Sequence, residues 1–270
     1  MSGPKPARPS LDLARIDLRL RRRSLIGYAI GMAIYAFVIV ALYPTFKDDA
    51  MLDEFTQKSS KLAALFGASG SLTSPPGWLN ANLYGNFVPL IILLLTIGYG
   101  AHAIAGQDED LTLGLAATLP VSRLSIVLQK FAVMCLVAVP VSVVTMLVVL
   151  AGRHYELPIG TGPLVGITVG AWLLGVDFGV LALLLGSLTG NRGLALGVTS
   201  AVAAAAYLIS SLAPAIDWLR PARFASPFYW AVGNGQVVDG LGVGSAVALV
   251  AVAVVLLAAS CAAFSRLDVH

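Results

Sequence analysis

Charged residues are scarce in this chain. Lys, Arg, Asp and Glu make up 11% of its 270 residues, hydrophobic residues make up 58%, and the mean hydropathy is +0.86. A soluble domain carries about 25% charged residues. The shortage of charge therefore excludes an ordinary soluble protein and indicates a chain whose solvent is lipid.

Residues that build disulfide, metal or nucleotide sites are also few. The two cysteines, Cys135 and Cys261, lie inside apolar stretches, so no disulfide framework or metal cluster is predicted. A P-loop needs a Gly-rich turn that ends in Gly-Lys, and no Gly-Lys pair occurs in the sequence. We therefore expect a chain that is not an enzyme and binds no cofactor itself.

Six apolar stretches are long enough to cross a hydrocarbon core, which takes roughly 20 helical residues. None of them alternates apolar and polar residues as the strands of a barrel do. The sequence thus predicts an all-α polytopic membrane protein, with a transmembrane domain over residues 24–270 and a basic cytoplasmic or elbow segment over residues 1–23. The six predicted spans are Ser24–Tyr43, Gly85–Ile104, Ser125–Ala151, Pro163–Gly186, Gly193–Ala213 and Leu241–Phe264.

Basic residues predict the orientation of these spans. Seven of the 17 Lys and Arg residues precede residue 24, and an inside N-terminus leaves 11 of the 17 on the inner side and 6 on the outer side. This bias predicts a multi-pass protein of the cell membrane with both termini in the cytoplasm. No basic face with interleaved aromatic residues follows the N-terminal cluster, so we expect no nucleic-acid partner. Within Leu11–Arg23 the apolar residues alternate, which fits a period of two at least as well as a helix.

Two outer segments differ in character. Residues 44–84 begin with charged residues and continue with Gly, Ser and Pro, which predicts an irregular outer loop. Residues 214–240 are rich in aromatic residues and are divided by prolines, so we predict short interfacial helices before the last span that lie in, or dip into, the outer leaflet. An ordinary aromatic belt at the membrane surface is the alternative. The aromatic residues are Trp218, Phe224, Phe228, Tyr229 and Trp230.

The inner loop over residues 105–124 has the most specific pattern. Three acidic residues begin a short amphipathic stretch, and negative charge favours the N-terminus of a helix. Pro120 then interrupts the chain before the third span. The loop therefore predicts a short cytoplasmic helix held between spans two and three.

This loop resembles the first cytoplasmic loop of type-2 permeases of ATP-binding-cassette transporters. The shared features are the acidic residues, a Thr-Leu step, small residues, Pro-Val-Ser-Arg and the following Lys130, although Leu111 replaces the usual Gly. The six spans, the basic lead and the Ser226-Pro227-Phe228 segment also resemble that family. The resemblance implies that the loop docks on a separate ATPase, which binds ATP and Mg. The implied contact residues are Asp108, Glu109, Asp110, Leu111, Thr112, Leu115, Pro120, Val121, Ser122 and Arg123.

The resemblance further implies what the chain does. It implies a permease that pairs with a second copy or with a paralogous permease. It also implies an exporter of a hydrophobic drug, antibiotic or lipid-like substrate, an efflux that gives antibiotic resistance. An ion-coupled secondary transporter that works without an ATPase is the alternative, although we find no convincing internal repeat and only one acid at mid-membrane depth.

That acid is Asp177, inside the fourth predicted span. An ionisable residue at such depth is costly and is a functional hypothesis by default. Either it faces a substrate pathway or it bonds to a neighbouring span, where Thr96, Tyr99, Thr199 and Ser200 are candidate partners. We place Asp177, Thr96 and Tyr99 in the candidate substrate pathway. Three glycine pairs are predicted to pack helices within one subunit, namely Gly27–Gly31, Gly166–Gly170 and Gly175–Gly179.

Overall fold

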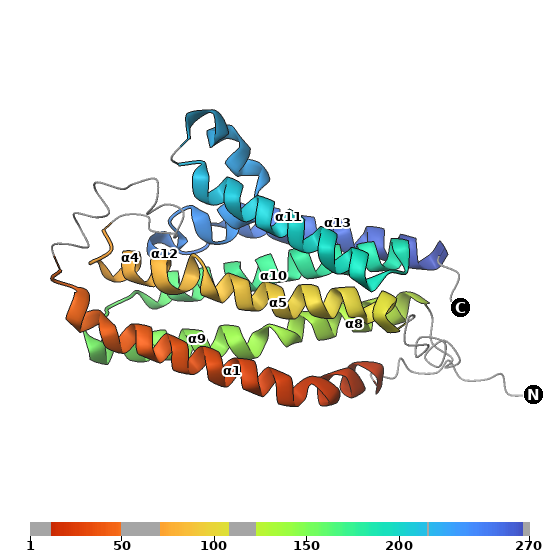
Figure 1. Ribbon diagram of the computed structural model, residues 1–270, viewed down its shortest axis with the longest axis horizontal. Coiled ribbons are helices and arrows are strands. Elements are labelled where there is room, and N and C mark those ends of the chain that lie inside the picture. The colour runs from red at the N-terminus through yellow and green to blue at the C-terminus, as the bar shows by residue number, and fades with distance from the viewer. Residues whose placement is uncertain (1–11, 50–70, 108–122, 215, 267–270) are drawn as a thin grey trace, which may run out of the picture.

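The computed structural model describes residues 12–49, 71–107, 123–214 and 216–266. Over these residues the protein forms helices and turns without strands, and six helical spans run along the long axis of one bundle (Figure 1). The predicted all-α polytopic fold is confirmed. We call the end of the bundle at which the first span begins and the last span finishes the basic end, since Arg19, Arg22 and Arg23 lie exposed there, and the opposite end the far end.

Several of the spans consist of more than one helical segment. The first span is α1 (Asp12–Phe46), and the second comprises α4 (Pro75–Leu79), η1 (Asn80–Tyr84), α5 (Phe87–Ala101) and η2 (His102–Gly106). The third comprises α8 (Arg123–Val137), α9 (Val139–Ala151) and η3 (Gly152–Tyr155). The fourth, fifth and sixth spans are α10 (Thr161–Thr189), α11 (Arg192–Leu212) and α13 (Val243–Arg266), and η4 (Asp217–Ala225), η5 (Tyr229–Gly233) and α12 (Gln236–Asp239) precede the sixth.

The basic segment before Ser24 continues directly into the first span. α1 starts at Asp12, so residues 12–46 form one helix rather than a helix preceded by a separate segment. Leu, Ala and Arg are good helix formers, and this local preference outweighs the apparent period of two. Whether residues 12–23 lie on the membrane surface stays a prediction.

The second span begins ten residues earlier than the sequence predicted, so the irregular loop predicted to reach residue 84 ends sooner. Ser74 caps α4 by accepting a hydrogen bond from the Gly77 N–H at 3.2 Å, and Pro75 takes the first helical position. The Trp78 indole then donates to the Ile39 carbonyl of α1 at 2.9 Å. The Pro-Pro pair therefore starts a helix here rather than a turn.

The third span breaks at Ala138, where the sequence predicted one continuous helix. Pro140 has no N–H to donate to the preceding turn, which disrupts the helix. The Trp172 indole of α10 donates to the Cys135 carbonyl beside the break at 2.9 Å. A neighbouring helix thus satisfies a carbonyl that lipid could not.

Helix α10 is the central span, packed against α5, α8, α9, α11 and α13. A Cβ added at Gly179 would lie 3.0 Å from the Cβ of Thr96 in α5, and one at Gly170 would overlap the carbonyl oxygen of Ala231 in η5. These two glycine pairs of α10 therefore pack helices within the subunit, as predicted.

The third glycine pair behaves differently. A Cβ added at Gly27 or Gly31 would meet nothing within 4 Å among the described residues. Both glycines line a hollow between α1 and α5 together with Tyr35 and Phe87. The prediction that this pair packs helices within one subunit is wrong for the described part of the chain.

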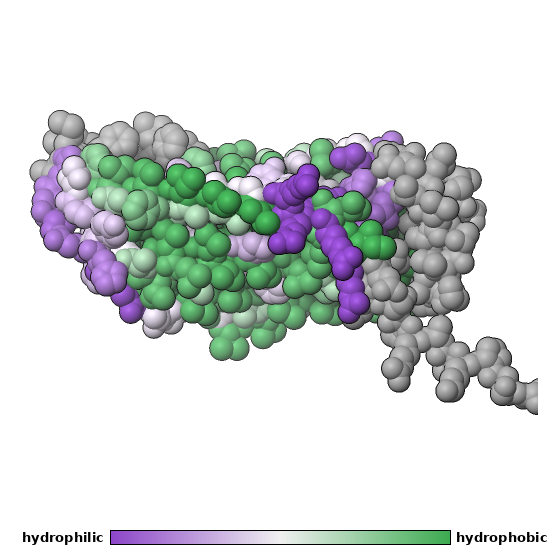
Figure 2. All heavy atoms as spheres, turned by 90° about the horizontal axis from the view of Figure 1, so that it is seen from below, coloured by the Kyte–Doolittle hydropathy of each residue, from purple (hydrophilic) through white to green (hydrophobic). Residues whose placement is uncertain are grey.

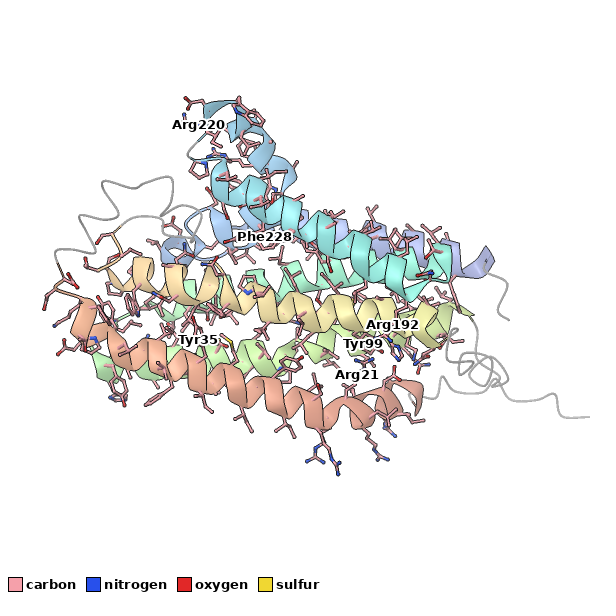
Figure 3. The ribbon with its side chains drawn as sticks, viewed as in Figure 1. Arg21, Tyr35, Tyr99, Arg192, Arg220 and Phe228 are labelled. Carbon is pink, nitrogen blue, oxygen red and sulfur yellow. The ribbon has the colours of Figure 1, made fainter. Side chains whose placement is uncertain are left out.

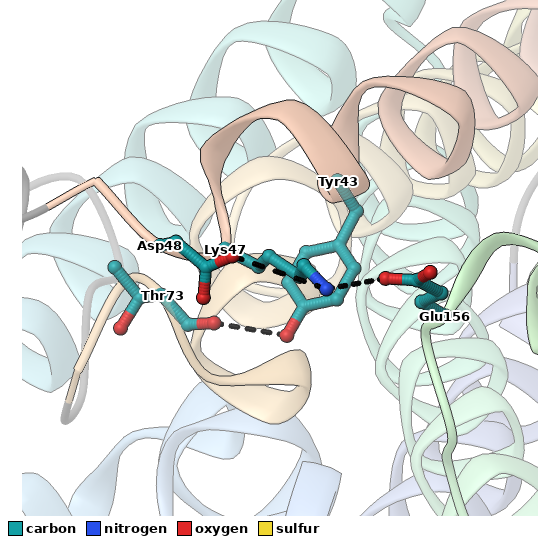
Figure 4. Close-up of polar contacts among 5 residues, drawn as sticks. All are labelled: Tyr43, Lys47, Asp48, Thr73 and Glu156. Atoms are coloured by element: carbon teal, nitrogen blue, oxygen red, sulfur yellow. Dashed lines mark hydrogen bonds and ion pairs between the residues drawn. The ribbon is translucent and has the colours of Figure 1, made fainter.

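The surface of the bundle has an apolar band bounded by polar residues. Figure 2 shows hydrophobic residues covering the middle of the face that carries α1, with hydrophilic residues towards both ends. At the far end Lys47, just after α1, forms an ion pair with Glu156, and the Tyr43 hydroxyl donates to the Thr73 carbonyl at 2.9 Å (Figure 4). These contacts tie the first outer segment to the end of the third span.

Candidate functional site

A groove of about 560 Å³ lies between α5 and α11. Leu93, Leu94 and Ile97 form its α5 wall, and small residues such as Ala203 and Ala204 form its α11 wall. Its shape follows from sequence, since Gly98 and the alanines of α11 leave room that larger side chains would fill. The groove therefore offers a largely apolar surface on the side of the bundle.

Polar and aromatic side chains bridge the groove at its far end. The Tyr207 hydroxyl of α11 donates to the Asn86 side-chain oxygen at the start of α5, and the rings of Tyr207 and Phe228 lie 5.5 Å apart. The Ser226 hydroxyl donates to the Ala206 carbonyl at 2.7 Å, which holds the Ser-Pro-Phe segment on α11. The segment that carried part of the family resemblance thus shapes one end of the groove.

Thr96 and Tyr99 do not line this groove. The Thr96 hydroxyl donates to the Ile92 carbonyl of its own helix at 3.0 Å, and its side chain packs against α10. The Tyr99 hydroxyl donates to Asp17 of α1 at 2.7 Å. The groove is therefore formed by a different face of the second span, and a pathway role for Thr96 and Tyr99 stays a prediction.

Asp177 is also separate from both residues. Thr96 packs on Gly175 and Gly179 of α10, and Asp177 lies midway between these glycines in sequence. A two-residue step turns a helix by about 200°, so Asp177 lies on the opposite side of α10, towards α11 and α13. The expectation that Thr96 or Tyr99 bonds to Asp177 is wrong, and Thr199 and Ser200 do not bond to it either, since neither Asp177 oxygen has a hydrogen-bond partner among the described residues.

A buried charged cluster near the basic end joins three spans, and sequence reasoning missed it. The Lys130 ammonium of α8 lies 2.8 Å from the Asp17 carboxylate of α1, which also accepts from Tyr99 of α5. The Arg21 guanidinium stacks 4.8 Å over the Tyr99 ring (Figure 3). Lys130 is only 2% exposed, and a charge at that depth requires a partner. The available signal was Asp17, one of two acids in the otherwise basic stretch over residues 11–23.

The cluster involves helices that flank the predicted ATPase-coupling loop in the sequence. Residues 108–122 lie outside the described part of the chain, and Arg123 is described only as the first residue of α8. The described helices on either side of the loop are η2, which continues α5, and α8. Both α5 and α8 contribute to the cluster, and the coupling role of the loop stays a prediction.

Comparison with known proteins assigns the chain to a family. No curated protein matches it. The family model described as "ABC-2 family transporter protein" matches residues 11–269, which is nearly the whole chain. This match does not favour the ion-coupled alternative. The protein, a multi-pass membrane permease, belongs to the ABC-2 family of transporter proteins.

Proposed function

We propose that this permease exports a hydrophobic, drug-like or lipid-like substrate with energy from separate ATPase subunits. The groove between α5 and α11 carries the proposal, because its walls are mostly apolar and it is open to the side of the bundle. Leu90 and Leu94 on its rim are 58% and 52% exposed. A substrate dissolved in the bilayer can therefore reach the groove without crossing water.

The basic end is the cytoplasmic side in this proposal. The Arg residues of α1 gather there, and basic residues favour the cytoplasmic side of a membrane. The far end, where Tyr207 bonds to Asn86, then faces outwards. The described conformation is accordingly closed towards the outside, and export requires that this bridge opens.

A second permease, either another copy or a paralogue, completes the pathway. One wall of the groove is missing in a single chain, as the exposure of Leu90 and Leu94 indicates. A partner permease that closes over the groove once the substrate has entered from the bilayer converts the groove into an enclosed route. The same pairing shields its apolar rim from water at the outer mouth.

The ATPase acts through the loop between the second and third spans. In this proposal Asp108, Glu109, Asp110 and the residues up to Arg123 dock on the ATPase. The Asp17–Lys130–Tyr99 cluster supports this route, because it joins the two helices beside the loop to α1. ATP need only favour one of two access states for transport to follow.

Co-purification tests the ATPase partnership. The tagged chain is isolated from its native membranes in mild detergent, and the proteins that accompany it are identified by mass spectrometry. We expect an ATP-binding-cassette ATPase with the unaltered chain and less of it when Asp108, Glu109 and Asp110 are changed to Ala. Asp48→Ala with Asp49→Ala is the matched control, because it removes acids at the far end. A stable complex that contains no such ATPase would contradict the proposal.

Obstruction of the groove tests the pathway. Ala204→Trp places an indole in the groove, whereas Val198→Trp on the same helix points away from it, since Val198 does not line the groove and is 43% exposed. In cells loaded with the neutral lipophilic dye Nile red, we expect the first variant to lose energy-dependent dye efflux and the second to retain it. Equal efflux by both variants would remove the groove from the pathway.

A further inference from the structure

Asp177 carries a buried carboxyl group inside the fourth span. It is 3% exposed, and neither side-chain oxygen has a hydrogen-bond partner among the described residues. It lies near the middle of α10, about 18 Å from the end at Thr189 at 1.5 Å per residue. An isolated carboxylate at this depth costs several kcal/mol, so the group requires either a bound proton or a cationic ligand.

Asp177 lines a cavity of about 320 Å³ on the side of α11 away from the groove, and its two carboxyl oxygens lie just behind the cavity surface. Leu181 of α10, Ile209 of α11 and Leu256 of α13 supply apolar walls. Of the described residues that line the cavity, Asp177 alone is ionisable. Ser226 is a second polar group there, and its hydroxyl oxygen retains acceptor capacity while its proton is donated to the Ala206 carbonyl.

The cavity is accessible from the lipid side of the bundle. Val202 of α11 and Val252 of α13 line it and are 44% and 41% exposed, so its mouth lies between these two helices. A ligand that arrives by this route must first dissolve in the bilayer. The site therefore combines an apolar approach, apolar walls and one acidic group just behind its surface.

We propose that this cavity binds a lipophilic amine in its protonated form. On binding, the Asp177 side chain turns towards the cavity, the ammonium group donates hydrogen bonds to its carboxylate and to the Ser226 hydroxyl oxygen, and the hydrocarbon part packs against Leu181 and Leu256. Charge pairing offsets the cost of burying both ions only when hydrogen bonds satisfy them, and an ammonium has three donors for this purpose. The site is separate from the groove and does not depend on its role in transport.

Binding to the full chain in lipid nanodiscs tests the proposal. Radiolabelled phenylbutylamine is equilibrated with loaded and with empty nanodiscs at neutral pH, without ATP or ATPase, and phenylbutanol serves as the uncharged counterpart. We expect saturable binding of the amine only. In Asp177→Asn, which keeps the shape and removes the charge, we expect affinity to fall about ten-fold or more, equivalent to about 1.4 kcal/mol.

A second pair of variants tests the location of the site independently of Asp177. Val252→Trp blocks the mouth between α11 and α13 and should abolish amine binding. Val254→Trp on the same helix is the matched control, because Val254 does not line the cavity and is 58% exposed. Equal amine binding by unaltered chain and Asp177→Asn would overturn the proposal, and so would saturable binding of phenylbutanol with equal affinity or an absence of saturable amine binding to the unaltered chain.

Discussion

The contact between α5 and α10 allows a sharp test of the packing, through Gly100→Ala. A Cβ at Gly100 would overlap the carbonyl oxygen of Gly179 and lie 3.2 Å from the Cβ of Ala182. A backbone carbonyl cannot rotate away, so the two helices must separate. Overpacking of this kind costs about 1–3 kcal/mol. Ala gains only about 1 kcal/mol over Gly as a helix former, so the net effect is a loss of stability.

Gly98→Ala is the matched control for this substitution. It adds the same methyl group to the same helix, where nothing lies within 4 Å among the described residues. We expect Gly98→Ala to unfold at or slightly above the wild-type temperature in detergent. Gly100→Ala should unfold several degrees lower, at about 2–4 °C for each kcal/mol. The packing argument fails if both variants unfold at the same temperature.

Three further predictions concern polar contacts. Lys130→Met removes the ion-pair partner of the largely buried Asp17, which keeps only its bond from Tyr99, and should destabilise the protein by about 3–5 kcal/mol in thermal unfolding. Adding Asp17→Asn should restore part of the loss, and no restoration would show that the pair is not coupled. Hydrogen bonding to Glu156 raises the pKa of Lys47. The stability that this exposed pair contributes is therefore complete below the ordinary lysine pKa of 10.5 and is lost as the pH rises beyond the raised value. A melting temperature that falls between pH 7 and 9 in the wild type but not in Lys47→Met would contradict this. Tyr207→Phe removes the bond across the far end of the groove and should increase passive dye leakage through the reconstituted permease, whereas unchanged leakage would mean that the bond does not hold the groove closed.

The fold was predictable because lipid imposes a simple rule on sequence. A span must satisfy its own backbone, so long apolar stretches such as the fourth, predicted at Pro163–Gly186 and observed at Thr161–Thr189, identify helices within a few residues. Local chemistry that breaks or extends a helix was harder to predict. Pro140 divides the third span, whereas Pro75 begins the second, and only the neighbours of each proline decide between these outcomes.

The candidate site was less predictable, since it depends on which face of each helix meets a neighbour. Asp177 stood out in the sequence because a charge in an apolar stretch is rare. The surroundings of Asp177 could not be predicted, because its direction around α10 depends on the glycines that let α5 pack closely on the opposite side of that helix. The ion pair of Asp17 with Lys130 joins residues 113 positions apart, and no periodicity along the chain connects them.

The break at Ala138 divides the third span into two helices that can move separately. The part towards the basic end, α8, is 15 residues long, or about 22 Å at 1.5 Å per residue, and it ends close to the point where the Trp172 indole donates to the Cys135 carbonyl. A force applied at Arg123 therefore acts on the short helix α8, which pivots where it contacts α10, rather than on one helix that crosses the whole membrane. Because Lys130 fastens α8 to Asp17, the start of α1 moves with α8, whereas α9 can keep its own contacts with α1.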